Sequence, residues 1–371
     1  MRNARTLRRG SWLLVAVCAL ARATAAAAAP PSLEDMQREV SAASQPSPAW
    51  SGPVSGPPAP PNKTVALLCE DLRNGGILGV AQGVQEAATI LGWTVKVFDA
   101  TGSPAGRDRA ATAALAARPD ALIVVGADAR DMQARLAPFA ERKLPVVGWH
   151  VGPRPGPVSG SPVAMNITTD PVHVARVTAM AAVIGSGGKA GVVVFTDSTF
   201  DIATAKSQVM AEIVRGCAGC VLLEVRDVPI SRAAELVPGV TRELLERHGA
   251  RWTHALAIND IYFDYAVPEI TRARRAEDSL SLLSAGDGST AAFMRLRAKV
   301  FQVATVAEPL TLHGWQLVDE VNRLIAGAPV TGYVAPVHLS TRQNIAVDGG
   351  TRHRYDPDNG YRDAYRRIWR R

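Results

Sequence analysis

Residues 79–129 read GVAQGVQEAATILGWTVKVFDATGSPAGRDRAATAALAARPDALIVVGADA, and this stretch decides the fold class. Apolar residues recur at helical spacing over Leu78–Leu91 and Ala105–Ala117. Short β-branched runs precede and separate these helices, at residues 64–69, 94–99 and 121–126. Near-continuous apolar strands are buried on both faces, and helices of this length connect parallel strands by right-handed crossovers. The stretch therefore predicts an α/β fold with a doubly wound parallel sheet.

The same alternation continues along the chain. Further strands are expected at residues 145–149, 191–195, 221–225, 255–258, 280–284 and 301–306. Further helices are expected at residues 129–142, 171–184, 202–215, 233–248, 290–299 and 310–325. These are more strands than one doubly wound sheet usually has, so we expect two similar lobes that divide near residues 165–170. Such sheets bind ligands outside the carboxyl ends of their strands, which predicts a ligand cleft between the lobes.

The N-terminal residues 1–29 have the pattern of a cleaved signal peptide. A basic front is followed by the apolar run Trp12–Leu20 and then by an Ala-rich stretch. This run is shorter than the roughly 20 residues that a membrane span needs. Removal of the segment lowers the formal charge from +7 to +2, because five arginines and no acidic residue leave with it. We therefore expect a periplasmic protein that is not embedded in a membrane and does not bind nucleic acid.

Two further segments flank the predicted lobes. Residues 30–62 form a Pro-rich leader in which Ser32 and Asp35 are spaced to start a short helix, and Trp50 is expected to pack onto the body. The C-terminal tail, residues 348–371, ends in alternating aromatic and arginine residues. This pattern predicts a helix that packs its aromatic face on a lobe and leaves its arginines in solvent.

Cys217 and Cys220 have CxxC spacing. Export favours a disulfide between them that clips a helix-to-strand turn, and a redox pair in a periplasmic oxidoreductase or isomerase is the alternative. Zinc would require a second ligand pair, which the sequence does not offer. The HExxH, GxSxG and GxxxxGK[ST] signatures are also absent, so we expect neither an enzyme nor a cofactor.

Four later segments complete a family pattern: KLPVVGWH (143–150), ALAINDIYFDYAV (255–267), LLSAGDGS (282–289) and VFQVATVAEP (300–309). Together with residues 79–129, in this order and spacing, they resemble the type I periplasmic solute-binding proteins of ABC importers, in the ribose-binding-protein and lac-repressor-like group. The resemblance covers residues 63–345. Regulators of that group carry a helix-turn-helix, and this chain has a signal peptide and leader in its place.

The resemblance implies two lobes with three hinge crossings. The N-lobe would comprise residues 63–166 and 309–337, and the C-lobe residues 167–308 and 338–347. The crossings would lie near residues 166–170, 307–310 and 336–339.

The resemblance also suggests ligand-binding residues in the C-lobe and at the hinge. Asn259 matches a position that hydrogen-bonds a sugar hydroxyl, although a helix cap would explain it equally well. Asp287 matches a carboxylate that accepts hydrogen bonds from hydroxyls, and a turn residue is the alternative. Glu308 lies where the family commonly has a polar ligand-binding side chain, or it is a hinge residue before Pro309.

Other positions depart from the sugar-binding pattern. Gly76 and Ile77 stand where sugar binders offer stacking aromatic rings, and Ile230 also replaces a frequent aromatic residue. His150 replaces a typical Asp, with Trp149 beside it, and no residue clearly matches the arginine that clamps sugar hydroxyls. The remaining candidates for the cleft are Arg73 and Asn74 in the first loop, Thr204 and Lys206 near the missing arginine, and Phe200 as an apolar wall.

We therefore expect a monomeric binding protein that captures a small polar, sugar-like solute by hinge closure and delivers it to an inner-membrane ABC permease. A non-sugar ligand, aromatic or apolar, or a signalling sensor of the same fold is the alternative.

Overall fold

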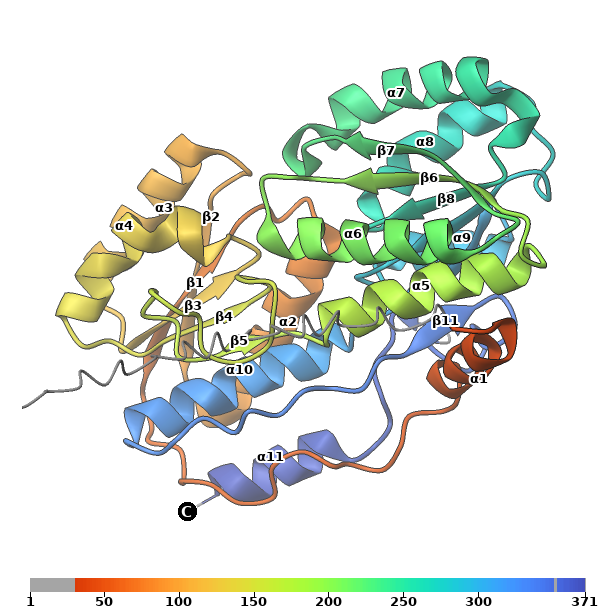
Figure 1. Ribbon diagram of the computed structural model, residues 1–371. Coiled ribbons are helices and arrows are strands. Elements are labelled where there is room, and N and C mark those ends of the chain that lie inside the picture. The colour runs from red at the N-terminus through yellow and green to blue at the C-terminus, as the bar shows by residue number, and fades with distance from the viewer. Residues whose placement is uncertain (1–30, 350–351, 371) are drawn as a thin grey trace, which may run out of the picture. The chain divides into compact units, whose positions relative to one another are not determined.

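The computed structural model describes residues 31–349 and 352–370 (Figure 1). The predicted signal peptide lies outside the described residues. Within the described part of the chain, no helix is long and apolar enough to cross a membrane.

The first sheet is parallel throughout, with the strand order β2-β1-β3-β4-β5. Its strands are β1 (Thr64–Cys69), β2 (Thr94–Asp99), β3 (Ala121–Val125), β4 (Val146–Trp149) and β5 (Asn166–Ile167). Its helices are α2 (Gly75–Leu91), α3 (Pro104–Ala116), α4 (Ala129–Glu141) and α10 (Leu310–Ile325). Alternate residues of β1 pack on opposite faces: Leu67 joins the apolar cluster of α2 and α10, and Leu68 joins that of α3 and α4.

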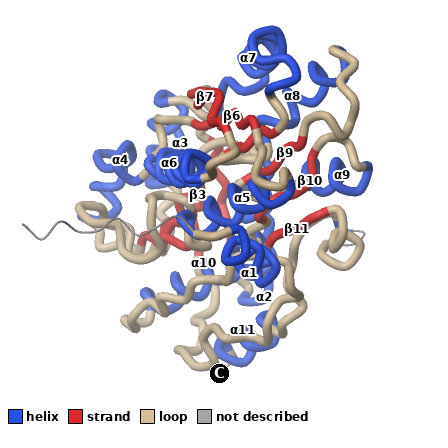
Figure 2. The backbone as a smooth tube through the Cα atoms, turned by 45° about the vertical axis from the view of Figure 1, so that its right-hand side comes forward, coloured by secondary structure: helices blue, strands red, loops and turns tan. Residues whose placement is uncertain are grey.

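The second sheet has the strand order β11-β10-β9-β8-β6-β7, and only β11 runs antiparallel among its described strands. Its strands are β6 (Gly191–Thr196), β7 (Val221–Asp227), β8 (His254–Ala257), β9 (Ser281–Ser284), β10 (Gln302–Val306) and β11 (Leu339–Thr341). Its helices are α5 (Pro171–Gly185), α6 (Asp201–Gly216), α7 (Ala233–His248), α8 (Ile261–Arg272) and α9 (Thr290–Ala298). Two short 3-10 helices, Ile230–Arg232 and Gly249–Arg251, flank α7. Figure 2 shows this sheet between the α5–α6 and α7–α8 layers. The two α/β lobes that the alternation predicted are therefore confirmed.

The nine predicted strands are all present, and two short ones were missed. β5 has two residues and β11 has three, so neither has enough length for periodicity to show. The α8 helix was also missing from the expected helices. The chain passes between the two sheets three times in the described residues: after β5, between β10 and α10, and between α10 and β11.

The leader runs across the molecule and contacts elements of both lobes (Figure 1). Its helix α1 (Leu33–Ala43) begins with a capping box between Ser32 and Asp35, and Met36 packs against Met180 of α5. Farther along, Trp50 packs against three tyrosine rings, those of Tyr333, Tyr361 and Tyr365, with centroids 4.9, 6.3 and 5.4 Å away.

The C-terminal helix α11 (Tyr361–Trp369) packs its aromatic face against α10. The rings of Trp315 and Trp369 stack with centroids 5.3 Å apart. The leader runs alongside this helix, where the Ala59 amide donates to the Trp369 carbonyl at 3.1 Å.

Cys217 and Cys220 form a disulfide in the turn between α6 and β7, with their Cα atoms 5.3 Å apart. Both cysteines pack on the cluster formed by Met36, Met180 and Val183, so the bond lies beside the leader helix. Cys69 is a free, buried thiol within β1.

Candidate functional site

The ends of strands from both sheets border one cavity of about 640 Å³ that includes some open solvent. Residues after β1, β3 and β4 of the first sheet line it, and residues after β7, β8 and β9 of the second sheet lie opposite them. The first turns of α2 and α6 complete the wall. This is the position at which parallel sheets bind ligands.

Asn259 serves as a helix cap and as a support for Asp287. Its Oδ1 accepts a hydrogen bond from the backbone N–H of Ile261 at 2.9 Å, at the start of α8. Its Nδ2 donates to Asp287 Oδ2 at 2.6 Å. The bond to Ile261 agrees with a capping role at the start of α8, and the bond to Asp287 orients that carboxylate in the cavity, while contact of Asn259 with a ligand stays a prediction.

Asp260 does not line the cavity, and its side chain connects β8, β9 and β10. Its carboxylate accepts hydrogen bonds from the Gly288 amide at 2.8 Å, Gln302 Nε2 at 2.8 Å and Thr305 Oγ1 at 3.3 Å. Because the side chain is fully buried and these donors depend on it, Asp260 holds the loop that carries Asp287.

Gly76 explains one departure from the sugar-binding pattern. A Cβ at this position would lie 2.2 Å from Asp287 Oδ2, so the start of α2 packs directly against the carboxylate. A stacking aromatic residue cannot occupy the position while Asp287 lies there.

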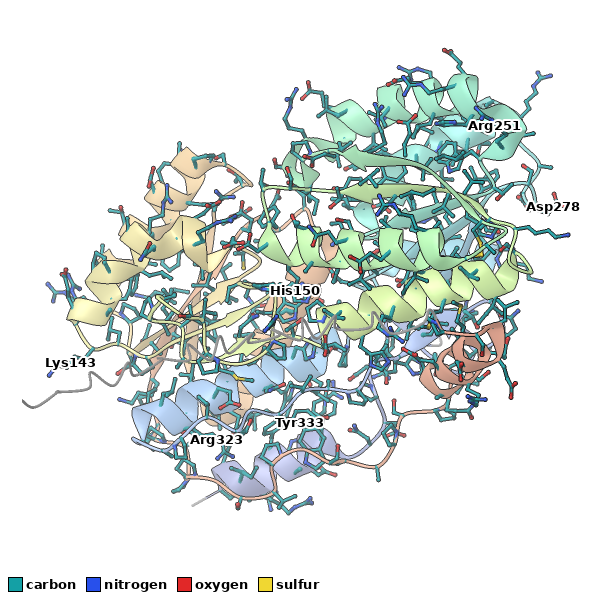
Figure 3. All side chains as sticks on the ribbon, viewed as in Figure 1. Lys143, His150, Arg251, Asp278, Arg323 and Tyr333 are labelled. Atoms are coloured by element: carbon teal, nitrogen blue, oxygen red, sulfur yellow. A yellow bond between two sulfur atoms is a disulfide. The ribbon has the colours of Figure 1, made fainter. Side chains whose placement is uncertain are left out.

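His150 follows the end of β4 (Figure 3) and lies near the carboxylates of Asp287 and Glu308. Its Nε2 is hydrogen-bonded to Glu308 Oε1 at 2.9 Å, and its Nδ1 lies 3.9 Å from Asp287 Oδ1. The ring stacks on Trp149, with centroids 3.6 Å apart and planes within 8°. Its backbone has φ +53°, a left-handed conformation that costs a non-glycine residue about 1–2 kcal/mol. Such strain is concentrated at functional sites.

Glu308 lies behind His150 at the hinge. Its Oε2 accepts a hydrogen bond from the Thr169 amide at 3.4 Å, so this carboxylate connects two of the three crossings. Burial opposes its ionisation, but His150 and Lys206 outweigh burial and lower the Glu308 pKa to about 2. Glu308 is therefore a buried, ionised anchor.

His313 of α10 is buried next to Glu308. Trp149 Nε1 donates to His313 Nδ1 at 3.1 Å, which leaves the imidazole proton on Nε2. Burial lowers the His313 pKa to about 4, which agrees with a neutral ring. Its Nε2 has no hydrogen-bond partner among the described residues.

The pKa of Asp287 shifts in the opposite direction to that of Glu308. Burial raises its pKa to about 6, while the charges of His150 and Lys206 act against the rise. The cavity thus contains a carboxylate that is costly to ionise and that hydroxyl donors of a ligand would stabilise.

Lys206 supplies a buried cation from α6. Its Nζ donates to the Ala285 carbonyl at 2.7 Å and lies 3.9 Å from Glu308 Oε1. Ligating atoms of His150, Asp287 and Glu308 all lie within 4.8 Å of one another, which is a spacing that a metal ion could bridge. However, His150 Nε2 is already hydrogen-bonded to Glu308, and the Lys206 ammonium lies beside the same carboxylate, so the Lys206 charge would oppose binding of a further cation.

The cavity brings together most of the residues suggested by the sequence. Its lining includes Asn74, Trp149, His150, Phe200, Lys206, Ile230, Asn259 and Asp287. Three candidates are not part of the lining: Glu308, Arg73 and Thr204. Glu308 is held behind His150, Arg73 is turned to solvent and paired with Asp71 at 2.6 Å, and Thr204 is partly buried on α6.

Further lining residues were not singled out from the sequence as cavity contacts. They are Glu70, Asp71, Gly102, Gly126, Ile202, Ala203, Ser231 and Ile258. Glu70, Gly126 and Ile258 each follow directly after a strand, so the strand-end rule could have found them. Gly102 and Ser231 lie in loops of different lobes that meet across the cavity, and their approach depends on the tertiary structure.

A model of the periplasmic binding protein domain matches residues 65–329. The chain belongs to the periplasmic binding protein family. Its matched segment includes both sheets except Thr64 and β11, and it contains every residue that lines the cavity. The predicted family is therefore confirmed.

Solved structures similar to this periplasmic binding protein share its fold at low identity. An ABC transporter solute binding protein from Agrobacterium vitis with bound allitol is 19% identical, with a TM-score of 0.65, and the match covers 76% of this chain and 97% of that one. Another from the same organism, bound with alpha-D-tagatopyranose, is 14% identical with a TM-score of 0.70 and covers 79% and 99%.

A 5-methylthioribose transporter solute binding protein from Thermotoga lettingae, in complex with 5-methylthioribose, is 19% identical with a TM-score of 0.69, and the match covers 83% of this chain and 93% of that one. A comparison with curated proteins gave no match. The helices α1 and α11 both lie outside residues 65–329.

Proposed function

We propose that this protein is the periplasmic solute-binding component of an ABC importer and captures a small hydroxyl-bearing, sugar-like molecule between its lobes. The cavity between the two rows of strand ends carries the proposal. Asp287 and Asn259 reach it from the second sheet, and His150 reaches it from the first. A ligand bound there contacts both lobes at once, so its binding favours the closed arrangement.

The relatives support a polyol ligand. Their structures hold allitol, tagatopyranose and 5-methylthioribose, which are all rich in hydroxyl groups. A buried carboxylate accepts several hydrogen bonds from such groups, and Asp287 offers one in the cavity. The protein would act as a monomer, after export by the signal peptide, and its closed form would be recognised by a membrane permease.

A catalytic role for the CxxC pair has less support. The cysteines are joined in a disulfide that packs on Met36 and Met180, and neither cysteine lines the cavity. The family itself is one of binding proteins.

Calorimetric titration with pentoses, hexoses and acyclic polyols tests the function. We expect at least one of them to bind at a single site with a Kd at or below micromolar. In Asp287→Asn the same ligand should bind about 10- to 100-fold more weakly, because a charged hydrogen-bond acceptor is worth about 1.5–3 kcal/mol.

Exposed Asp278→Asn is the matched control and should leave the affinity unchanged. Binding of aromatic acids or amines alone, with no polyol bound, would instead support the alternative of a non-sugar ligand.

A further inference from the structure

Most polar groups at the cavity wall are already paired within the protein. Both oxygens of Glu70 accept hydrogen bonds from Arg107, at 2.8 and 2.6 Å. Both oxygens of Asp71 accept from Arg73, at 2.9 and 2.6 Å. These two carboxylates line the cavity, but their oxygens are already hydrogen-bonded to arginines that do not line it, so they offer little to a ligand hydroxyl.

Apart from Asn74 Nδ2 and Ser231 Oγ, which also make no hydrogen bond among the described residues, the unpaired polar groups of the lining lie around Asp287. Among the described residues, Asp287 Oδ1 accepts no hydrogen bond, and His150 Nδ1, 3.9 Å from it, makes none. Lys206 Nζ has three N–H donors and uses one of them, toward Ala285. The Lys206 side chain is only 3% exposed, so its other donors are directed into a buried space. The Asp287 Oδ1 acceptor, the two unused N–H donors of Lys206 and the unpaired Nδ1 of His150 therefore lie together on the floor of the cavity.

The rest of the wall is largely aliphatic. The apolar lining residues are Ile77, Trp149, Phe200, Ile202, Ala203, Ile230 and Ile258. Ile77 comes from the first turn of α2 and Ile202 from the first turn of α6, so both lobes contribute. Ile230 is held in place because its amide donates to Asp197 Oδ2 at 2.7 Å. A ligand hydroxyl placed against these side chains would lose its water without gaining a partner, which disfavours binding.

We propose that the ligand is an amphipathic polyol, with adjacent hydroxyls bound by Asp287, Lys206 and His150 and a deoxy, alkyl or thioether substituent packed against Ile77, Ile202 and Ile230. This inference rests on the proposed function and specifies the ligand class of the same cavity. It also accounts for Ile77 and Ile230 at positions where sugar binders carry aromatic rings, because an aliphatic side chain contacts an apolar substituent and not the face of a pyranose.

Calorimetry with matched ligand pairs tests the inference. Each pair differs at one carbon: ribose with 5-deoxyribose and 5-methylthioribose, and galactose with 6-deoxygalactose. We expect the substituted member to bind more tightly, by roughly fourfold for each methyl-sized group buried. The Ile202→Asn and Ile230→Asn variants should bind the substituted member no more tightly than the hydroxylated one, so the affinity ratio of each pair falls to about one. Exposed Ile90→Asn is the control and should behave as wild type.

The outcomes separate the two proposals. If the hydroxylated members bind as tightly as their partners or more tightly, the amphipathic ligand is ruled out and the binding function stands. If no member of any pair and no other polyol binds, the proposed function fails and this inference fails with it.

Discussion

Asp287 and Asp260 are two buried carboxylates of one strand-end cluster with different tasks. Asp260 has several protein donors, whereas Asp287 has only Asn259 within hydrogen-bonding distance among the described residues. The sequence identified Asp287 and Asn259 by resemblance but could not tell that one amide both caps a helix and orients the carboxylate. That arrangement depends on the distance between two loops that lie 28 residues apart.

Affinity for the ligand is expected to depend on pH through Asp287. Its pKa is raised to about 6 by burial, so the ionised acceptor is lost as the pH falls through this value. Calorimetry from pH 5 to pH 8 should show constant affinity above about pH 7 and weaker binding below pH 6, with no such change in Asp287→Asn.

His150→Gln should move the midpoint upward, because the His150 charge lowers the Asp287 pKa. If affinity falls at the wild-type pH midpoint in both Asp287→Asn and His150→Gln, another group controls the pH dependence of binding.

Ionisation of Asp287 should lower the stability of the ligand-free fold, although it strengthens ligand binding. A raised carboxyl pKa means that the folded state binds the proton more tightly, so ionisation destabilises the fold above pH 6 and has no effect below the unfolded value near 4. Asp287→Asn is therefore expected to raise the Tm of the ligand-free protein at pH 7.5 and leave it nearly unchanged at pH 4. Differential scanning calorimetry at the two pH values measures this, and a lower Tm at pH 7.5 would contradict it.

Asp260→Ala should destabilise the fold. Three buried donors would lose their acceptor, each at a cost of about 1–3 kcal/mol, so we expect a loss of at least about 3 kcal/mol in urea unfolding. Exposed Asp358→Ala is the comparison, with an effect within about 0.5 kcal/mol. Equal stability of the two variants would refute the structural role.

At the scale of elements, the strand and helix positions were predictable because each βα unit carries its own periodicity. What periodicity could not reveal was the docking of the leader and tail, which depends on contacts such as Trp50 with Tyr333 and Tyr365. Figure 3 places Tyr333 and Arg323 near α10 and α11, and Arg323 Nη2 donates to the Ser55 carbonyl at 2.7 Å.

Trp50→Ala should lower the free energy of unfolding by about 2–4 kcal/mol, because an aromatic residue is removed from a packed cluster. Val54, four residues away and 76% exposed, provides the control: Val54→Ala should change stability by less than about 0.5 kcal/mol. If both variants unfold at the same urea concentration as wild type, the leader does not contribute to stability.

Replacing Cys217 and Cys220 with serine should cost about 2 kcal/mol of stability, because the disulfide closes only a short loop. Ligand affinity should not change, since neither residue lines the cavity. A loss of binding, or thiol-disulfide exchange activity in the wild type, would favour the redox alternative.

At the scale of the whole molecule, the account depends on closure of two lobes around a ligand. The hinge lies beside β5 in the first sheet and beside β10 and β11 in the second. The strands at the opposite edges, β2 and β7, are therefore farthest from the hinge. Arg130 of α4 and Asp201 of α6 form an ion pair between the two lobes, 2.7 Å apart. The sequence predicted the division into lobes from the number of strands, but the contacts between lobes come from loops without a periodic pattern.

The most direct test measures the distance between the two far edges. Spin labels on Val97→Cys in β2 and Val225→Cys in β7 would report it, because both side chains are exposed, at 37% and 43%, while Cys69 is buried and the other described cysteines are joined. Pulsed electron resonance should show a broad or long distance distribution without ligand and a shorter, narrower one at saturation with a polyol that binds. An identical distribution before and after saturation would contradict capture by hinge closure.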